Sequence, residues 1–272
     1  MNNEQNEKNI TTSEIWADIE AIRKSSPLIH NITNYVVMNT TANALLAIGA
    51  SPVMAHAEPE IKQIVEIASG LVVNIGTLSD PWIKAMLMAG QKAEEKNIPI
   101  ILDPVGAGAT EYRTNTAHRL INNIHPSIIR GNASEIMAIT EKSIKTKGVD
   151  SINASDEAIC SAQILNRDTN SIVCISGAHD YIVSNKGNDL ITIRNGHAMM
   201  QNVTGMGCTA SALCGAFAAV NHEYEKAAAH AMAVMGIAGE IAGAKSKGPG
   251  TFQTNFIDAL YQLSEKDIKQ YL

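Results

Sequence analysis

The sequence predicts an α/β domain in which helices cover both faces of a mainly parallel central sheet. Short apolar runs alternate along the chain with longer amphipathic ones, and turn residues stand at almost every junction. Several of the short runs are β-branched on both faces, as is typical of strands that are covered on both sides. Repeated alternation of strand and helix favours a parallel sheet, because each crossover helix packs back onto a face of the sheet.

Each element follows from one such run. The predicted strands of the alternating part lie at 25–30, 51–55, 71–76, 98–105, 127–131 and 171–177. The predicted helices between them lie at 33–48, 58–68, 80–96, 114–124, 132–141 and 155–169. After Gly177 the glycine-containing link KGND joins two alternating runs, YIVSN and LITIRN, which predicts a β-hairpin. The remainder is predicted to be helical at 206–220, 223–244 and 253–270, with KGPGT separating the last two helices.

Length and charge narrow the class of protein. The 272 residues show no internal repeat and no convincing linker, so we expect a single domain over 11–272 behind a flexible N-terminal tail over 1–10. The chain has 21 basic and 27 acidic residues and no block of lysine and arginine, which argues against a nucleic-acid or anionic-membrane partner. No uncharged apolar run reaches the roughly 18 residues of a membrane span. The four cysteines contain no CxxC pair and no signal peptide precedes them, so we expect reduced thiols and a cytoplasmic location.

The stretch VTGMGC runs from a predicted extended segment into a predicted helix. The backbone N–H groups of Gly205 to Cys208 would then point out of a helix N-terminus, which binds anions through its free donors and its dipole. Gly205 and Gly207 would let the backbone turn tightly and approach a ligand closely. The alternative is a structural glycine turn. A thiolate at Cys208 would be favoured by the helix end, whereas a free cysteine in general is more often a small buried apolar residue.

Two further strand ends carry polar groups. IILDPVGAGAT places Asp103 at the carboxyl end of a strand, where open α/β sheets bind their ligands. IIRGNASEI places Arg130 in the next strand and sets Asn132 and Glu135 three residues apart at a helix start. Asn132 and Glu135 fit a helix-capping pair. Alternatively Glu135, with Asp103 at the adjacent strand end, would hold a hydrated Mg²⁺ ion.

Four stretches, taken in order, resemble the hydroxyethylthiazole kinase family of the ribokinase-like superfamily. They are PLIHNITNYVVMNTTANALLAIGASPVMAHA, ILDPVGAGAT, IRGNASEI and NVTGMGCTASALCGAF, and the likeness extends from about Ser26 to the end of the chain. The resemblance implies a three-layer α/β/α, ribokinase-like fold. It implies phosphorylation of the primary alcohol of 4-methyl-5-(2-hydroxyethyl)thiazole by ATP with Mg²⁺. It also implies a homotrimer with active sites at the subunit interfaces.

Carried over by motif, the resemblance assigns roles to particular residues. From the residues alone, Asn34 is interpreted as a helix cap and Met54 as core. The family instead implies that Met54, Gly205 and Asn34 bind the thiazole. It implies that Arg130, Ser176 and Asn132 bind ATP, and that Glu135 and Asp103 hold the metal.

The same resemblance places the chemistry at the glycine turn. Cys208 stands where the wider superfamily has an aspartate that serves as the base. Phosphoryl transfer depends mainly on positioning and on stabilising charge. We therefore expect the N–H donors around Gly205 and Gly207 to carry most of the catalysis, and Cys208 to be a modest proton acceptor or a positioning group.

Other functions stay open at this point. One class is another enzyme on the same scaffold: a hydroxymethylpyrimidine or pyridoxal kinase, or an ATP-dependent hydrate dehydratase. A second is a thiazole-binding protein without catalysis, against which Asp103, Glu135 and the glycine turn argue together. A third is a redox sensor at Cys208, for which the sequence offers no neighbouring resolving cysteine.

Overall fold

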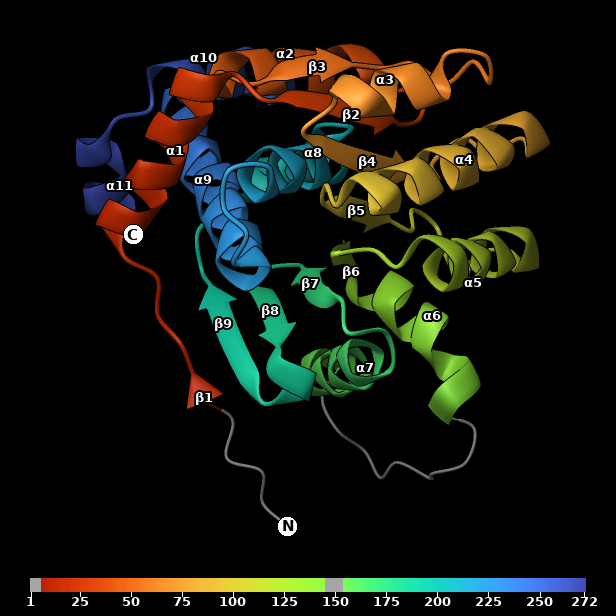
Figure 1. Ribbon diagram of the computed structural model, residues 1–272. Helices are drawn as coiled ribbons and strands as arrows, with labels where there is room; N and C mark the ends of the chain where they lie inside the picture. The colour runs from red at the N-terminus through yellow and green to blue at the C-terminus, as the bar shows by residue number, and fades with distance from the viewer. Residues whose placement is uncertain (1–5, 145–153) are drawn as a thin grey trace.

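A nine-stranded sheet runs through the computed structural model, which describes residues 6–144 and 154–272 (Figure 1). The strand order is β1-β9-β8-β7-β6-β5-β4-β2-β3. β8 is antiparallel to both its neighbours, and every other pairing is parallel. The strands are β1 Asn6–Glu7, β2 Leu28–Ile32, β3 Ser51–Val53, β4 Gly70–Asn74, β5 Ile100–Asp103, β6 Ile128–Asn132, β7 Ile172–Ser176, β8 Asp180–Ser184 and β9 Asp189–Ile193. The mainly parallel sheet and the hairpin predicted from the sequence are thus confirmed.

Helices cover both faces of this sheet, as the three-layer prediction requires. Each face has its own cluster of buried apolar side chains, because successive residues of a strand point to opposite sides. One face carries α1 Thr12–Ser25, α2 Met38–Ile48, α8 Met206–Ala218, α9 Tyr224–Lys245, α10 Pro249–Gln262 and α11 Glu265–Tyr271. The other carries α3 Ile61–Ile67, α4 Asp80–Lys96, α5 Glu111–Ile124, α6 Ala133–Ile144 and α7 Ala154–Thr169.

α9 lies at the centre of the first face. By length and composition it could cross a membrane, yet most of its residues are buried in this structure. Its alanines and glycines let α8 and α10 approach closely, so α9 is a buried core helix.

The helix boundaries differ from the prediction at two places. α2 begins at Met38 rather than at residue 33, because the Asn34 side chain accepts a hydrogen bond from the Val36 N–H at 3.2 Å and holds a turn there. The predicted helix over 253–270 is two helices. Ser264 interrupts it by capping α11, and its side chain and that of Asp267 exchange hydrogen bonds with each other's backbone.

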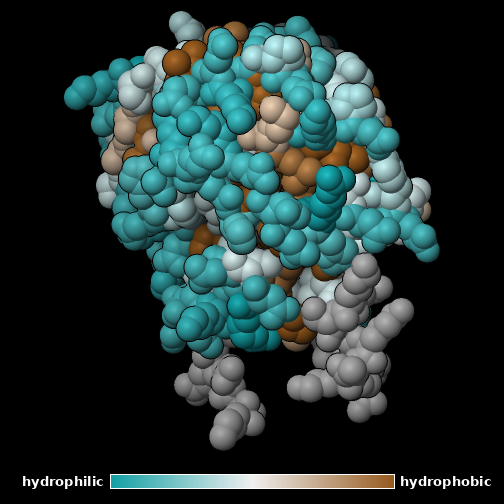
Figure 2. Space-filling model, turned by 45° about the vertical axis from the view of Figure 1, so that its right-hand side comes forward, coloured by the Kyte–Doolittle hydropathy of each residue, from teal (hydrophilic) through white to brown (hydrophobic). Residues whose placement is uncertain are grey.

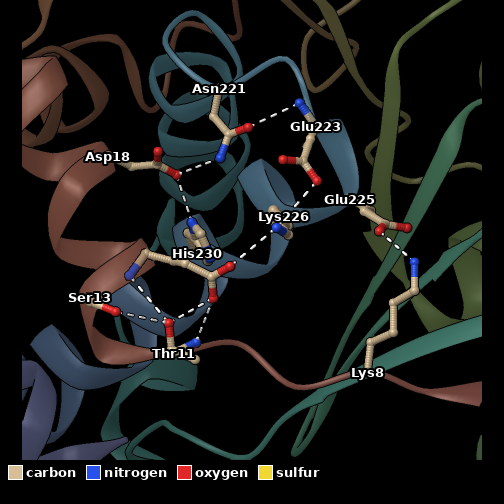
Figure 3. Close-up of polar contacts among 10 residues, drawn as sticks. Lys8, Thr11, Ser13, Asp18, Asn221, Glu223, Glu225, Lys226 and His230 are labelled. Atoms are coloured by element: carbon tan, nitrogen blue, oxygen red, sulfur yellow. Dashed lines mark hydrogen bonds and ion pairs between the residues drawn. The ribbon is translucent and has the colours of Figure 1, made fainter.

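The N-terminal segment differs more from the prediction, because it contains a helix and a short strand that were not predicted. α1 lies outside the predicted helices, although Thr11 and Glu14 form a capping box at its start. It packs against α9, where Asp18 contacts the fully buried His230 at 2.6 Å and Lys226 reaches Glu14 at 3.1 Å (Figure 3).

Part of the predicted tail also belongs to the sheet. Asn6 and Glu7 form β1 beside β9, and Lys8 makes ion pairs with Asp189 and Glu225, both at 2.7 Å. Residues 6–8 are therefore anchored at the edge of the sheet, while residues 1–5 lie outside the described part of the chain.

Candidate active site

The carboxyl ends of four parallel strands bring the polar residues of the site to one edge of the sheet. β4 ends at Asn74 beside Asp103, the last residue of β5. β6 ends at Asn132 beside Ser176, the last residue of β7. Asp103, Asn132 and Ser176, which sequence motifs single out one by one, therefore share one edge, and Asn74 joins them without having been predicted.

A chain of buried hydrogen bonds connects this edge to the glycine turn. The Asn34 side-chain amide donates to Asn74 Oδ1 at 2.9 Å and to the sulfur of Cys208 at 3.4 Å. The Asn74 amide donates in turn to Asp103 Oδ2 at 2.9 Å. The Ser211 hydroxyl, one turn along α8 from Cys208, donates to the same oxygen at 2.7 Å. The loop after β2, the ends of β4 and β5, and the start of α8 are thus held by one network.

Asp103 is the charged centre of this network. The side chain is 1% exposed, and burial raises its pKa from 3.8 to about 6. The Arg130 guanidinium, 3.8 Å from Oδ2, and the hydrogen bonds from Ser211 and Asn74 act in the opposite direction but do not offset the burial. The second oxygen, Oδ1, is buried and has no hydrogen-bond partner among the described residues. Such an atom is expensive to leave unpaired, so Asp103 is suited to receive a ligand.

Arg130, in β6, connects Asp103 to Ser176 at the end of β7. Its Nη2 donates to the Ser176 hydroxyl, and that hydroxyl lies 3.4 Å from the Gly131 carbonyl oxygen. A Cβ atom at Gly207 would lie 2.8 Å from Arg130 Nη1, so only glycine lets the first turn of α8 pack directly on the guanidinium. This close approach places a buried positive charge beside a helix N-terminus.

A cavity of about 690 Å³ opens next to Arg130, a volume typical of small-molecule sites. Arg130, Ser176 and Gly207 line it, as expected of residues that share a ligand. The rest of the wall is formed by residues that the sequence did not single out, among them Asp180, Asn195, His197, Met200, Met232 and Gly236.

The N-terminus of α8 separates this cavity from Asn34 and Cys208. Gly205 is the N-cap residue and has a φ of 84°, and a Cβ there would lie 2.8 Å from Val37 Cγ1. The first intrahelical bond runs from the Thr209 N–H to the Gly205 carbonyl at 2.8 Å. The N–H groups of the three intervening residues, 206–208, therefore have no acceptor within the helix and are free to bind an anion.

Comparison with known proteins identifies the family of this chain. Residues 19–266 match the sequence model of the hydroxyethylthiazole kinase family. The chain belongs to this family. A hydroxyethylthiazole kinase of Syntrophus aciditrophicus is 58% identical over 264 residues, which cover 97% of each chain. The solved structure of the hydroxyethylthiazole kinase from Pyrococcus horikoshii OT3 is 41% identical, has a TM-score of 0.88, and the match covers 95% of this chain and 97% of that one.

More distant matches bear on the fold alone. A ribokinase-like superfamily protein from Enterococcus faecalis superposes with a TM-score of 0.61 at 14% identity, over 99% of this chain and 93% of that one. A pyridoxal kinase from Staphylococcus aureus superposes with a TM-score of 0.59 at 14% identity, over 80% and 89%. The ribokinase-like fold is therefore confirmed.

The sequence leaves the ionisation of Cys208 open, because a helix N-terminus favours a thiolate whereas a buried cysteine stays a thiol. In the structure, burial and the nearby Asp103 charge raise the pKa of Cys208, although hydrogen bonds from Asn74 and Asn34 act in the opposite direction. The thiol form is consequently favoured at neutral pH.

The capping interpretation of Asn132 and Glu135 is confirmed in its geometry. Asn132 Oδ1 accepts from the Glu135 N–H at 2.9 Å, and Glu135 Oε2 accepts from the Asn132 N–H at 2.9 Å. Glu135 Oε1 accepts a further hydrogen bond from the Gly106 N–H at 2.8 Å. Glu135 thereby ties the start of α6 to the glycine loop after β5. Across the described residues, the side chains alone do not gather three or more His, Cys, Asp or Glu groups into a metal cluster.

Met54 lies apart from the cavity. It follows the edge strand β3 and is half-buried, and the neighbouring Ala55 carbonyl is held by His30 Nε2 at 2.7 Å. Aromatic side chains lie close by: the rings of Tyr35 and His56 both contact the buried Trp82, with centroids 4.8 and 4.6 Å away. The family's expected thiazole-binding positions are therefore divided between this edge and the Asn34–Gly205 region.

Proposed function

We propose that this chain transfers the γ-phosphoryl group of ATP to the primary alcohol of 4-methyl-5-(2-hydroxyethyl)thiazole, as in thiamine salvage. The observation that carries the proposal is the first turn of α8, which has a nucleotide-sized cavity on one side and the Asn34–Cys208 pair on the other. Membership of a family whose relatives are named hydroxyethylthiazole kinase supports the same reaction.

The cavity is suited to ATP. Arg130 offers a buried guanidinium that pairs with phosphate in a fixed, planar geometry, and Ser176 orients it. The free N–H groups at the start of α8 then face the same anion. Asn132 is exposed at the neighbouring strand end, and we assign it to nucleotide binding as well.

Transfer would depend on the N–H groups of Gly207 and its neighbours, which stabilise the charge on the transferring phosphoryl oxygens. Cys208, as a thiol hydrogen-bonded to Asn34, positions the acceptor hydroxyl. Because the transition state is loose, the acceptor proton leaves late, and a strong base at Cys208 is not required.

Asp103 and Glu135 are the residues that we assign to Mg²⁺. Asp103 fits this role because its buried Oδ1 has no hydrogen-bond partner within residues 6–144 and 154–272, and Mg²⁺ is commonly held by one or two carboxylates, water and substrate phosphates. Glu135, in the first turn of α6, already accepts backbone hydrogen bonds from Gly106 and Asn132, so it would act on the ion's site mainly by ordering the glycine loop after β5. The ion supplies positive charge that neutralises the phosphates.

We further propose a homotrimer in which the next subunit covers the edge near Met54, where Tyr35 and Val36 are exposed. Tyr35 and Val36 are each 64% exposed although they directly follow Asn34. Figure 2 shows apolar residues reaching the surface between hydrophilic ones on its face of the molecule. Sedimentation or light scattering should give three times the 29.0 kDa chain mass; a monomer would contradict this assembly.

Release of ADP by the purified protein with Mg²⁺ and ATP tests the reaction. Hydroxyethylthiazole should stimulate release, whereas hydroxymethylpyrimidine, pyridoxal and a no-acceptor control should not. Stimulation by another acceptor alone would favour one of the other enzymes on this scaffold. Calorimetric binding of the thiazole without ADP release would favour a binding protein.

A further inference from the structure

Arg113 lies in the first turn of α5, and its guanidinium contacts two loops at the ligand-binding edge of the sheet. Nη1 donates to the Ile75 carbonyl at 2.8 Å and to the Val105 carbonyl at 2.7 Å. Nη2 donates to the Gly76 carbonyl at 2.8 Å. These acceptors come from the loops after β4 and β5, not from the helix that carries Arg113.

The second loop is packed against Arg113 as well as hydrogen-bonded to it. Gly106 has a φ of 75°, and a Cβ atom there would lie 3.1 Å from Arg113 Cδ. The Gly106 N–H donates to Glu135 Oε1 at 2.8 Å. Arg113 from α5 and Glu135 from α6 thus hold this loop from two directions.

These loops directly continue the strands that carry the buried network. Ile75 follows Asn74, and Val105 lies two residues after Asp103. The backbone bond from the Ile75 N–H to the Asp103 carbonyl, at 3.2 Å, extends the β4–β5 pairing by one residue. Arg113 continues this connection beyond the strand ends, where the two chains enter separate loops.

We propose that Arg113 is a positioning residue for phosphoryl transfer, a role that rests on the function proposed above. By joining the two loops, it keeps Asn74 and Asp103 in contact, and through them Asn34, Cys208 and Arg130. The planar fork of a guanidinium can meet three carbonyls that converge from two directions, which a lysine ammonium on a flexible stem does less well. Arg113 itself need touch neither substrate.

Arg113→Ala and Arg113→Lys test this role, and Arg119→Ala is the matched control. Arg119 is on the same helix and has an exposed side chain. We expect kcat to fall about 10²-fold in Arg113→Ala, with the KM values for ATP and thiazole changed little, because a small misplacement of reacting groups has an effect of this size. Arg113→Lys should be intermediate, and Arg119→Ala should match the wild type.

Two further measurements separate positioning from a loss of folded protein. Nucleotide-binding stoichiometry gives the fraction of competent sites; a drop in that fraction with unchanged kcat per site would overturn the proposal. Hydrogen–deuterium exchange should be faster at 75–79 and 104–110 in Arg113→Ala and in Arg113→Lys, but not in Arg119→Ala. Unchanged exchange in these loops would also overturn it. If the wild type shows no thiazole-dependent turnover, the proposed function fails, while the exchange comparison still decides whether Arg113 holds the loops.

Discussion

Asp103→Asn isolates the energetic effect of one buried charge at the centre of the site. The variant keeps an amide oxygen that can accept from Asn74 and Ser211, but it cannot ionise. In the wild type, burial raises the pKa of Asp103 from 3.8 to about 6. Since one pKa unit corresponds to about 1.4 kcal/mol, ionising Asp103 in the folded protein costs about 3 kcal/mol more than in the unfolded chain.

The sign of the pH dependence follows from this difference. The folded state binds the Asp103 proton more tightly than the unfolded state does. Asp103 therefore adds stability below about pH 4, and this contribution is lost as the pH rises through about 6. The free energy of unfolding of Asp103→Asn, relative to the wild type, should increase by about 3 kcal/mol between about pH 4 and about pH 8.

Urea titrations without Mg²⁺, at several pH values across this range, measure the effect. Asp180, whose pKa burial also raises to about 6, titrates in both proteins and cancels in the comparison. A constant offset between the two proteins over the whole range would refute the account of Asp103. In parallel, Mg²⁺ should bind the wild type more weakly as the pH falls through about 6, because the ion must compete with the proton on Asp103. Asp103→Asn should have low activity at every pH.

Three other substitutions test separate parts of the structure. Cys208→Ala should keep kcat within about tenfold of the wild type, less than the loss of 10²-fold or more that removal of a general base produces; steady-state assays with binding controls decide this. Gly205→Ala should lower the free energy of unfolding by about 2 kcal/mol, because its φ of 84° is left-handed and Val37 crowds the Cβ, and kcat should fall by about 10²-fold. Asp18→Ala should lower the urea-derived unfolding free energy by about 2 kcal/mol without changing kcat, since it removes the hydrogen-bond partner of the buried His230 Nδ1; wild-type stability in that variant would contradict the pairing of α1 with α9.

The parts of the site that could be predicted from the sequence are those encoded by neighbouring residues. A strand ends where an apolar run meets a polar residue, so Asp103 could be placed at the ligand-binding edge from ILDP alone. The glycines before α8 signalled a helix start with free N–H groups. α1 could also have been predicted from the sequence, because Thr11 and Glu14 have capping-box spacing.

Other parts depend on contacts between distant segments. Asn74 lies inside LVVNIG, which predicts only a strand, yet its hydrogen-bond partners Asp103 and Asn34 are 29 and 40 residues away. Arg113 donates to backbone carbonyl groups. Because every residue has such a group, the sequence does not indicate which residues Arg113 contacts. The cavity wall contributed by α9 consists of Met and Gly, the same residue types that fill any helical core. The raised pKa of Cys208 follows from burial and Asp103, and the sequence alone could not decide between a buried thiol and a thiolate at the helix end.

A crystal structure with Mg²⁺, a non-hydrolysable ATP analogue and hydroxyethylthiazole tests the central claim most directly. The account predicts the nucleotide in the cavity beside Arg130, its terminal phosphate at the N–H groups that start α8, and the thiazole hydroxyl on the Cys208 side of that turn. Thiazole and nucleotide bound on the same side of α8, or a terminal phosphate away from its first turn, would contradict it.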